Sequence, residues 1–128
     1  MIALELPWPP TINHYYRNTK AGIFLGKSGR LYRAEVLQVV KYEAKITKPL
    51  ESELEMAVKL FPPNRRSFDL DNRLKALLDA MEHAGVYCND RQIRKLYIED
   101  TGQLGGFAEV YINPMVSHET KIVACCGE

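Results

Sequence analysis

The sequence lacks any apolar run of the roughly 18 to 20 residues that a membrane-spanning helix needs. Its first ten residues, MIALELPWPP, have neither the basic segment nor the small-residue cleavage site of a secretory signal. These absences argue against a membrane protein and against a secreted one. We therefore expect a soluble, cytoplasmic protein with no membrane partner.

Cysteine is also scarce, since the chain contains only Cys88, Cys125 and Cys126. Three cysteines form no even disulfide framework, and two adjacent cysteines are poorly placed to ligate a structural metal. We therefore expect three reduced thiols rather than a disulfide-rich scaffold or a zinc module.

The chain has 128 residues, of which 46% are hydrophobic and 26% charged, with 8 Gly and 7 Pro. This balance excludes disordered, collagenous and low-complexity classes. A chain of this length can bury roughly two thirds of its unfolded surface, so we expect one globular domain with its own core.

Acidic residues are absent between Glu5 and Glu35, although the whole chain carries a net charge of only +1. This interval contains five cations and four aromatic residues: Arg17, Lys20, Lys27, Arg30, Arg33, Tyr15, Tyr16, Phe24 and Tyr32. Such a segment suits phosphate contact and base stacking. A solvated surface loop whose tyrosines pack on the core is the open alternative.

Hydrophobic periodicity predicts strands at residues 2–6, 54–60, 95–99 and 107–112, with a short strand at 86–88. Two helices are expected from three- and four-residue steps. The first spans 31–46 with Leu31, Ala34, Leu37, Val40 and Ala44; the second follows Asp69 or Asp71, with Leu74, Leu77, Leu78 and Met81, and stops at Gly85. Residues 13–30 suit a hairpin or an exposed loop better than a helix, and we expect a flexible basic loop there.

These elements favour an α+β fold, a small single domain with a mixed or antiparallel sheet and two main helices. We place the domain at residues 1–113 and expect 114–128 to be a loose C-terminal tail.

The segment RRSFDLDNRLK at residues 65–75 is the most informative for chemistry. Asp69 and Asp71 point to the same side if the backbone is extended there, and Lys75 follows Asp71 by four residues on one helix face. We expect Asp90 to fold back beside the start of this helix. Three carboxylates would suit Mg²⁺ or Mn²⁺, which prefer oxygen ligands, and a lysine beside them indicates phosphoryl transfer.

A purely structural interpretation of the same residues stays open. An Asp before an apolar helix is commonly an N-cap, and Lys75 can pair with Asp71 or Asp79 across one turn of the helix. Asp90, which follows Asn89, would then be a turn residue.

The segments PWPPTINHYYR at 7–17, RRSFDLDNRLKALLDAM at 65–81 and AGVYCNDRQI at 84–93 resemble the RusA family of Holliday junction resolvases, often carried by prophages. The resemblance covers most of residues 5–113. It implies a homodimeric endodeoxyribonuclease that acts in DNA recombination and repair. Such an enzyme would make paired symmetric nicks in four-way DNA junctions with Mg²⁺ or Mn²⁺.

The same resemblance implies that Asp69, Asp71 and Asp90 bind the metal and that Lys75 is the catalytic lysine. The chain differs from the family pattern at Asn89, where a second acidic residue often precedes the third aspartate. The candidate DNA-binding residues are Arg17, Lys20, Lys27, Arg30, Arg65, Arg66 and Arg73.

A homodimer is also expected on symmetry grounds, because resolving a junction needs two related cuts, which a twofold dimer supplies to a twofold substrate. A non-catalytic module that binds branched or single-stranded DNA is the alternative function.

Overall fold

The computed structural model describes residues 1–115. Four strands form its main sheet in the order β1-β6-β4-β5. Their bounds are β1 Ile2–Pro7, β4 Leu54–Phe61, β5 Ile93–Asp100 and β6 Phe107–Pro114. Strand β6 is antiparallel to β1 and β4, whereas β5 is parallel to β4, so the sheet is mixed. The predicted α+β class is confirmed.

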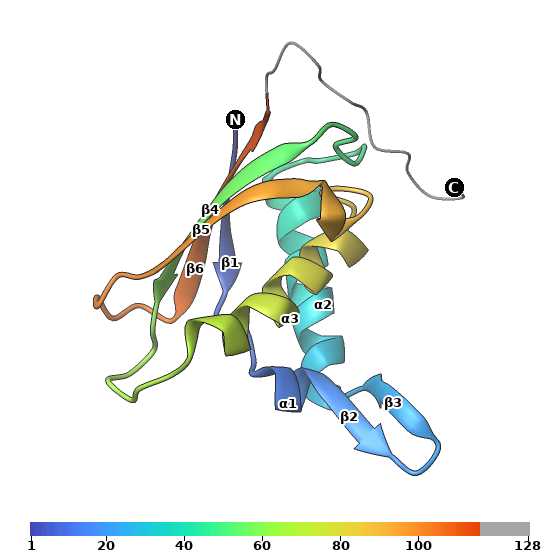
Figure 1. The fold of residues 1–128 in the computed structure, drawn as a ribbon, viewed down its shortest axis with the longest axis vertical. Helices are drawn as coiled ribbons and strands as arrows, with labels where there is room; N and C mark the ends of the chain where they lie inside the picture. The colour runs from blue at the N-terminus through green and yellow to red at the C-terminus, as the bar shows by residue number, and fades with distance from the viewer. Residues whose placement is uncertain (116–128) are drawn as a thin grey trace.

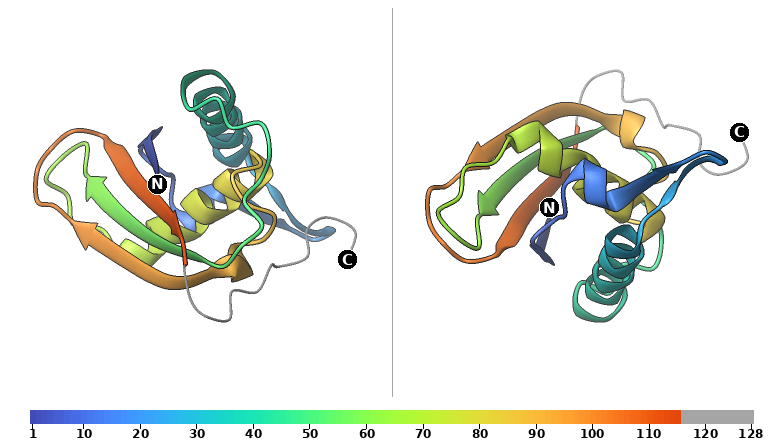
Figure 2. Two further views of the ribbon diagram at one scale, coloured as in Figure 1. Left: turned by 90° about the horizontal axis from the view of Figure 1, so that it is seen from above. Right: turned by 90° about the horizontal axis from the view of Figure 1, so that it is seen from below.

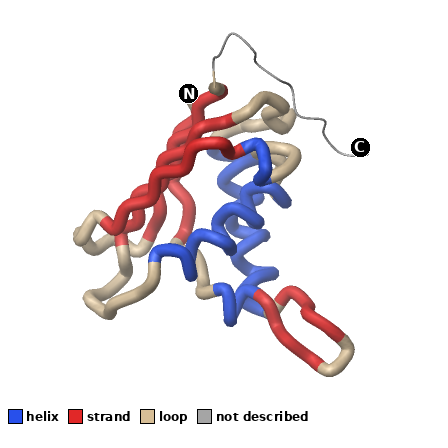
Figure 3. Tube along the Cα trace, viewed as in Figure 1, coloured by secondary structure: helices blue, strands red, loops and turns tan. Residues whose placement is uncertain are grey.

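Two main helices lie on one face of this sheet, as Figures 1 and 3 show. They are α2 (Lys27–Gln38), which continues as a π-helical turn over Val39–Glu43, and α3 (Leu70–His83). A short helix α1 (Ile12–Tyr15) and a hairpin of β2 (Tyr16–Thr19) and β3 (Gly22–Leu25) precede α2. The two views of Figure 2 show the sheet curving around α3 while its other face stays uncovered.

Strand β4 has the alternation that the sequence predicts. Leu54, Met56, Val58 and Leu60 are buried on the helix side, and the residues between them are half-buried. Parallel pairing with β5 needs a crossover connection, and α3 supplies it. The helix that carries the candidate catalytic residues is thereby packed between the sheet and α2.

The prediction for residues 13–46 is only partly correct. Residues 16–25 do form a hairpin, but α2 begins at Lys27 rather than 31, and Leu31 is 57% exposed. The helix instead buries Gly29, Tyr32 and Val36. A Cβ on Gly29 would lie 2.3 Å from the Tyr15 carbonyl oxygen, so this glycine marks a close helix contact and not a loop.

The prediction of three reduced thiols is wrong for Cys88, which is disulfide-bonded in the structure. Cysteine spacing could not reveal this, because a disulfide joins residues that only the fold brings together. Cys125, Cys126 and most of the predicted 114–128 tail lie outside the described residues. Over residues 1–115, no helix is long and apolar enough to cross a membrane.

Helix α3 stops at Gly85, as predicted. The Val86 amide donates to the Met81 carbonyl and the Gly85 amide to that of Glu82, the hydrogen-bond pair of a Schellman motif. Gly85 has φ +85°, a left-handed conformation in which a Cβ is strained.

We predict that Gly85→Ala lowers the free energy of unfolding by about 1 kcal/mol. No atom lies within 4 Å of the position of a Cβ, so the cost is conformational rather than a clash. Gly85→Asn should cost less, because asparagine tolerates this conformation better. Urea unfolding of the three proteins measures the difference, and equal stability of the two variants would contradict this explanation.

Candidate active site

One face of α3 carries a row of charged side chains. Asp71, Lys75, Asp79 and Glu82 follow one another at steps of four, four and three residues, the spacing of neighbours on a helix. The opposite side of α3 is buried in the core. We call this row the polar face of α3, and it presents the candidate catalytic groups away from the sheet.

Asp69 and Asp71 lie at the start of this helix. Asp69 occupies the N-cap position, but its side chain accepts no capping hydrogen bond, and Asp71 lies in the first turn. Both side chains are exposed, and neither forms a hydrogen bond or ion pair with any residue in 1–115. The hydrogen-bonded cap of the structural interpretation is therefore not present, and both carboxylates are available to a ligand.

Asp90 lies elsewhere than we predicted. Its backbone amide donates to Glu82 Oε1 at 2.9 Å, which places it beside the C-terminal end of α3. Asp71 and Glu82 are separated by about 16 Å along the axis, at 1.5 Å per residue. No three His, Cys, Asp or Glu residues of the described part of the chain are close enough to hold a metal ion. Residues 1–115 of a single chain therefore do not fit a three-carboxylate metal centre.

The position of Asp90 is fixed by Gln92, a residue that our sequence reasoning missed. Gln92 is fully buried, and its Oε1 accepts hydrogen bonds from the amides of Cys88 and Asn89, each at 2.8 Å. Its Nε2 donates to two carbonyls of residues 50–52. The sequence did contain an indication of this role. Asn89 and Gln92, three residues apart, form a capping box at the start of the short helix η2 (Asp90–Gln92).

Asp79 lies at the centre of a second cluster that the sequence did not reveal. Arg33 Nη2 donates to Asp79 Oδ2 at 2.7 Å, and Arg33 Nε donates to the Tyr15 hydroxyl at 2.9 Å. The Tyr15 hydroxyl in turn donates to Asp79. Burial and this bond to Asp79 raise the pKa of Tyr15 above its usual range. Three side chains thus join α1, α2 and α3.

Because Asp79 pairs with Arg33, it does not pair with Lys75 as the structural interpretation allowed. Lys75 is exposed and forms no ion pair within residues 1–115. Its ammonium group is free to meet a phosphate one turn beyond Asp71. The alternative for the basic segment, tyrosines that pack on the core, holds for Tyr15 and Tyr32, which are buried.

Six of the seven candidate DNA-binding cations are exposed: Arg17, Lys20, Lys27, Arg30, Arg65 and Arg66. Arg73 differs, because its Nη1 donates to the Pro9 carbonyl at 2.8 Å and its guanidinium lies 5.3 Å from the centre of the Trp8 ring. Burial lowers the pKa of Arg73. This arginine holds the proline-rich segment after β1 against α3.

The chain is similar to proteins of one family. The model of the family described as endodeoxyribonuclease RusA matches residues 7–113. The chain belongs to the RusA family. It is 34% identical over 91 residues to the crossover junction endodeoxyribonuclease RusA of Escherichia coli strain K12, covering 71% of this chain and 75% of that protein. It is 37% identical over 87 residues to the one of Enterobacteria phage HK97, covering 68% and 72%.

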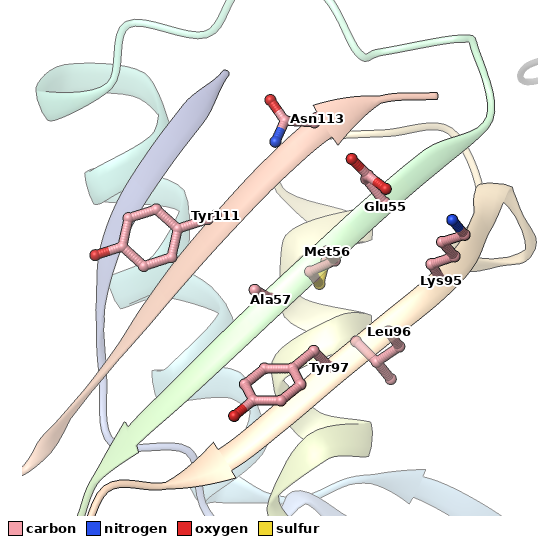
Figure 4. A pocket seen from close by; sticks show the side chains of 8 residues that line it. All are labelled: Glu55, Met56, Ala57, Lys95, Leu96, Tyr97, Tyr111 and Asn113. Atoms are coloured by element: carbon pink, nitrogen blue, oxygen red, sulfur yellow. The ribbon is translucent and has the colours of Figure 1, made fainter. Parts of the chain in front are cut away.

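The uncovered face of the sheet in this RusA-family chain carries a hollow and, beside it, a mostly acidic row of side chains. Figure 4 shows a hollow there whose lining includes Tyr97, Ala57 and Tyr111. The neighbouring cross-strand row is mostly acidic and consists of Glu5, Glu109, Lys59 and Glu99. Three carboxylates against one ammonium disfavour phosphate. Arg65, Arg66 and Lys75 are exposed around the start of α3, so DNA is expected there.

We predict that Tyr15→Phe lowers the free energy of unfolding by about 1 to 2 kcal/mol, because Asp79 loses a hydrogen-bond donor while the ring stays packed. Urea unfolding is the measurement. Tyr42→Phe is the matched control, since Tyr42 is 68% exposed and should lose nothing. Equal stability of Tyr15→Phe and the wild type would show that the cluster does not join the helices.

Proposed function

We propose that this RusA-family chain is a metal-dependent endodeoxyribonuclease that resolves four-way DNA junctions by paired symmetric nicks. The observation that carries the proposal is the family match over residues 7–113, which includes Asp69, Asp71, Lys75 and Asp90. The name crossover junction endodeoxyribonuclease of its relatives supports the choice of substrate.

The side chains at the start of α3 fit this chemistry. Asp69 and Asp71 are exposed carboxylates without partners in the described residues, and oxygen ligands of this kind suit Mg²⁺ or Mn²⁺. Lys75 supplies a positive charge where negative charge develops on a phosphate. Arg65 and Arg66, in the exposed loop before α3, are expected to contact the DNA backbone.

The distance between Asp90 and the other two carboxylates bears on how the metal would be held. We infer that two chains form each centre, with Asp69 and Asp71 from one chain and Asp90 of the partner subunit. Two observations support this inference: α3 separates the carboxylates within one chain, and a four-way junction has the twofold symmetry of a dimer.

We predict that Asp71→Asn abolishes cleavage of a synthetic four-way junction while the free energy of unfolding changes by less than about 0.5 kcal/mol. Asparagine is a comparable residue at a helix start but a far poorer ligand for a hard cation. Junction binding should persist or tighten, because a negative charge is removed. Glu5→Gln, on the uncovered sheet face, is the control that keeps cleavage. Normal cleavage by Asp71→Asn would remove Asp71 from the site.

Mixed dimers test the shared centre. We predict that a heterodimer of an Asp71→Asn chain and an Asp90→Asn chain nicks one strand of a junction, although each homodimer is inactive. A centre made from two chains leaves one site intact in this heterodimer, whereas a centre within one chain leaves both damaged. Differently tagged chains allow the heterodimer to be purified, and a gel detects the nicked junction. No nicking would refute the shared centre.

A DNA-binding module without nuclease activity is the second candidate, favoured by the lack of a three-carboxylate cluster within the described residues of one chain. Junction, flap and linear duplex substrates with Mg²⁺, Mn²⁺ or a chelator separate the two functions. Tight binding of the junction with no metal-dependent product would favour the module.

A further inference from the structure

The β2–β3 hairpin extends away from the rest of the molecule in Figures 1 and 3. Each strand has four residues, so the hairpin is about 13 Å long at 3.3 Å per residue. Ile23 and Phe24 lie in the middle of β3 with 70% and 52% of their surfaces exposed. A single exposed apolar residue is ordinary, but two neighbours on a projecting element indicate a binding surface.

Hydrogen bonds hold the hairpin at both ends. At the tip, the Thr19 hydroxyl donates to the Gly22 carbonyl at 2.9 Å, and Gly22 has φ +130°. At the root, the Gly26 amide donates to the Tyr15 carbonyl at 2.8 Å. The Tyr15 hydroxyl bonds to Asp79 of α3. The exposed apolar side chains are therefore presented on a fixed support.

The strand register puts the two apolar side chains on opposite faces of the hairpin. Phe24 is paired with Arg17, and Ile23 is paired with Asn18. Neighbouring side chains in a strand point to opposite faces. A hairpin that docks flat on a protein needs one apolar face, whereas apolar side chains on both faces suit insertion between two layers.

The charge around the hairpin indicates what kind of molecule it would insert into. Arg17 and Lys20 are exposed on it, and no acidic residue occurs between Glu5 and Glu35. This charge complements phosphate. The root lies beside the polar face of α3, since Tyr16 follows Tyr15, whose hydroxyl donates to Asp79.

We propose that the β2–β3 hairpin is a wedge that recognises the branch point of a DNA junction. Phe24 stacks on a base where the arms part, Ile23 contacts the base on the other face of the hairpin, and Arg17 and Lys20 neutralise neighbouring phosphates. A wedge in continuous duplex must break base stacking between steps that both strands hold together. At a branch point strands exchange between arms, so the stack between two arms is easier to open. The hairpin therefore supplies the preference for junctions, an inference that rests on the proposed function.

The test compares binding to a four-way junction and to a linear duplex in the presence of a chelator, which prevents metal-dependent cleavage. Phe24→Ala should weaken junction binding on the order of tenfold, as expected for loss of one stacked base, and leave duplex binding nearly unchanged. Phe24→Trp should restore the preference. The matched control is Tyr97→Ala, because Tyr97 is also a half-exposed aromatic, 57% exposed, but lies on the uncovered sheet face.

A fluorescent base analogue, 2-aminopurine, placed beside the branch point reports stacking directly. Its fluorescence should change when the wild type or Phe24→Trp binds, and should change much less with Phe24→Ala. An unchanged junction preference in Phe24→Ala, or an equal loss of junction and duplex binding, would refute the wedge.

Failure of the wedge is distinguishable from failure of the proposed nuclease. A wild type that prefers junctions and needs Phe24, but yields no product with Mg²⁺ or Mn²⁺, would refute the nuclease and support the wedge. A Phe24→Ala variant that still cleaves junctions and keeps the preference for junctions over duplex would support the nuclease and refute the wedge.

Discussion

The arrangement of the helical side depends on the contacts of Tyr15. Its carbonyl oxygen accepts the Gly26 amide at the root of the hairpin, and its hydroxyl donates to Asp79 on α3. Arg33 of α2 donates to both Tyr15 and Asp79. A buried phenol can satisfy partners on two other elements at once because it is both donor and acceptor. The hairpin and the polar face of α3 are thereby held in one orientation.

Helix α3 is rigid, so it keeps the candidate catalytic groups at its two ends apart. Asp71 and Asp90 are held at opposite ends of α3, the latter through Glu82 and the buried amide of Gln92. Closing that distance within one chain would require breaking the hydrogen bonds of Gln92, whose buried polar atoms would then be unsatisfied. When a second chain supplies Asp90, no element of the first chain has to move, and the hydrogen bonds of Gln92 stay intact.

The sequence predicted features that depend on local patterns and missed those that depend on distant contacts. The alternation of β4, the start of α3 after Asp69 and its end at Gly85 follow from neighbouring residues. The start of α2 was missed because Gly29 was interpreted as a loop signal, whereas it allows contact with residues far along the chain. Arg73, a candidate DNA contact, also bonds to the Pro9 carbonyl, a distant contact that no local pattern indicates.

The two sides of the molecule differ in charge, and this difference complements the proposed reaction. Carboxylates repel the phosphates that they must approach, so a nuclease site needs cations beside its acids. On the helical side, Lys75, Arg65 and Arg66 are exposed around the start of α3. On the uncovered sheet face, the acidic cross-strand row has one lysine and no arginine. We therefore expect DNA to approach the side where these cations accompany the free carboxylates.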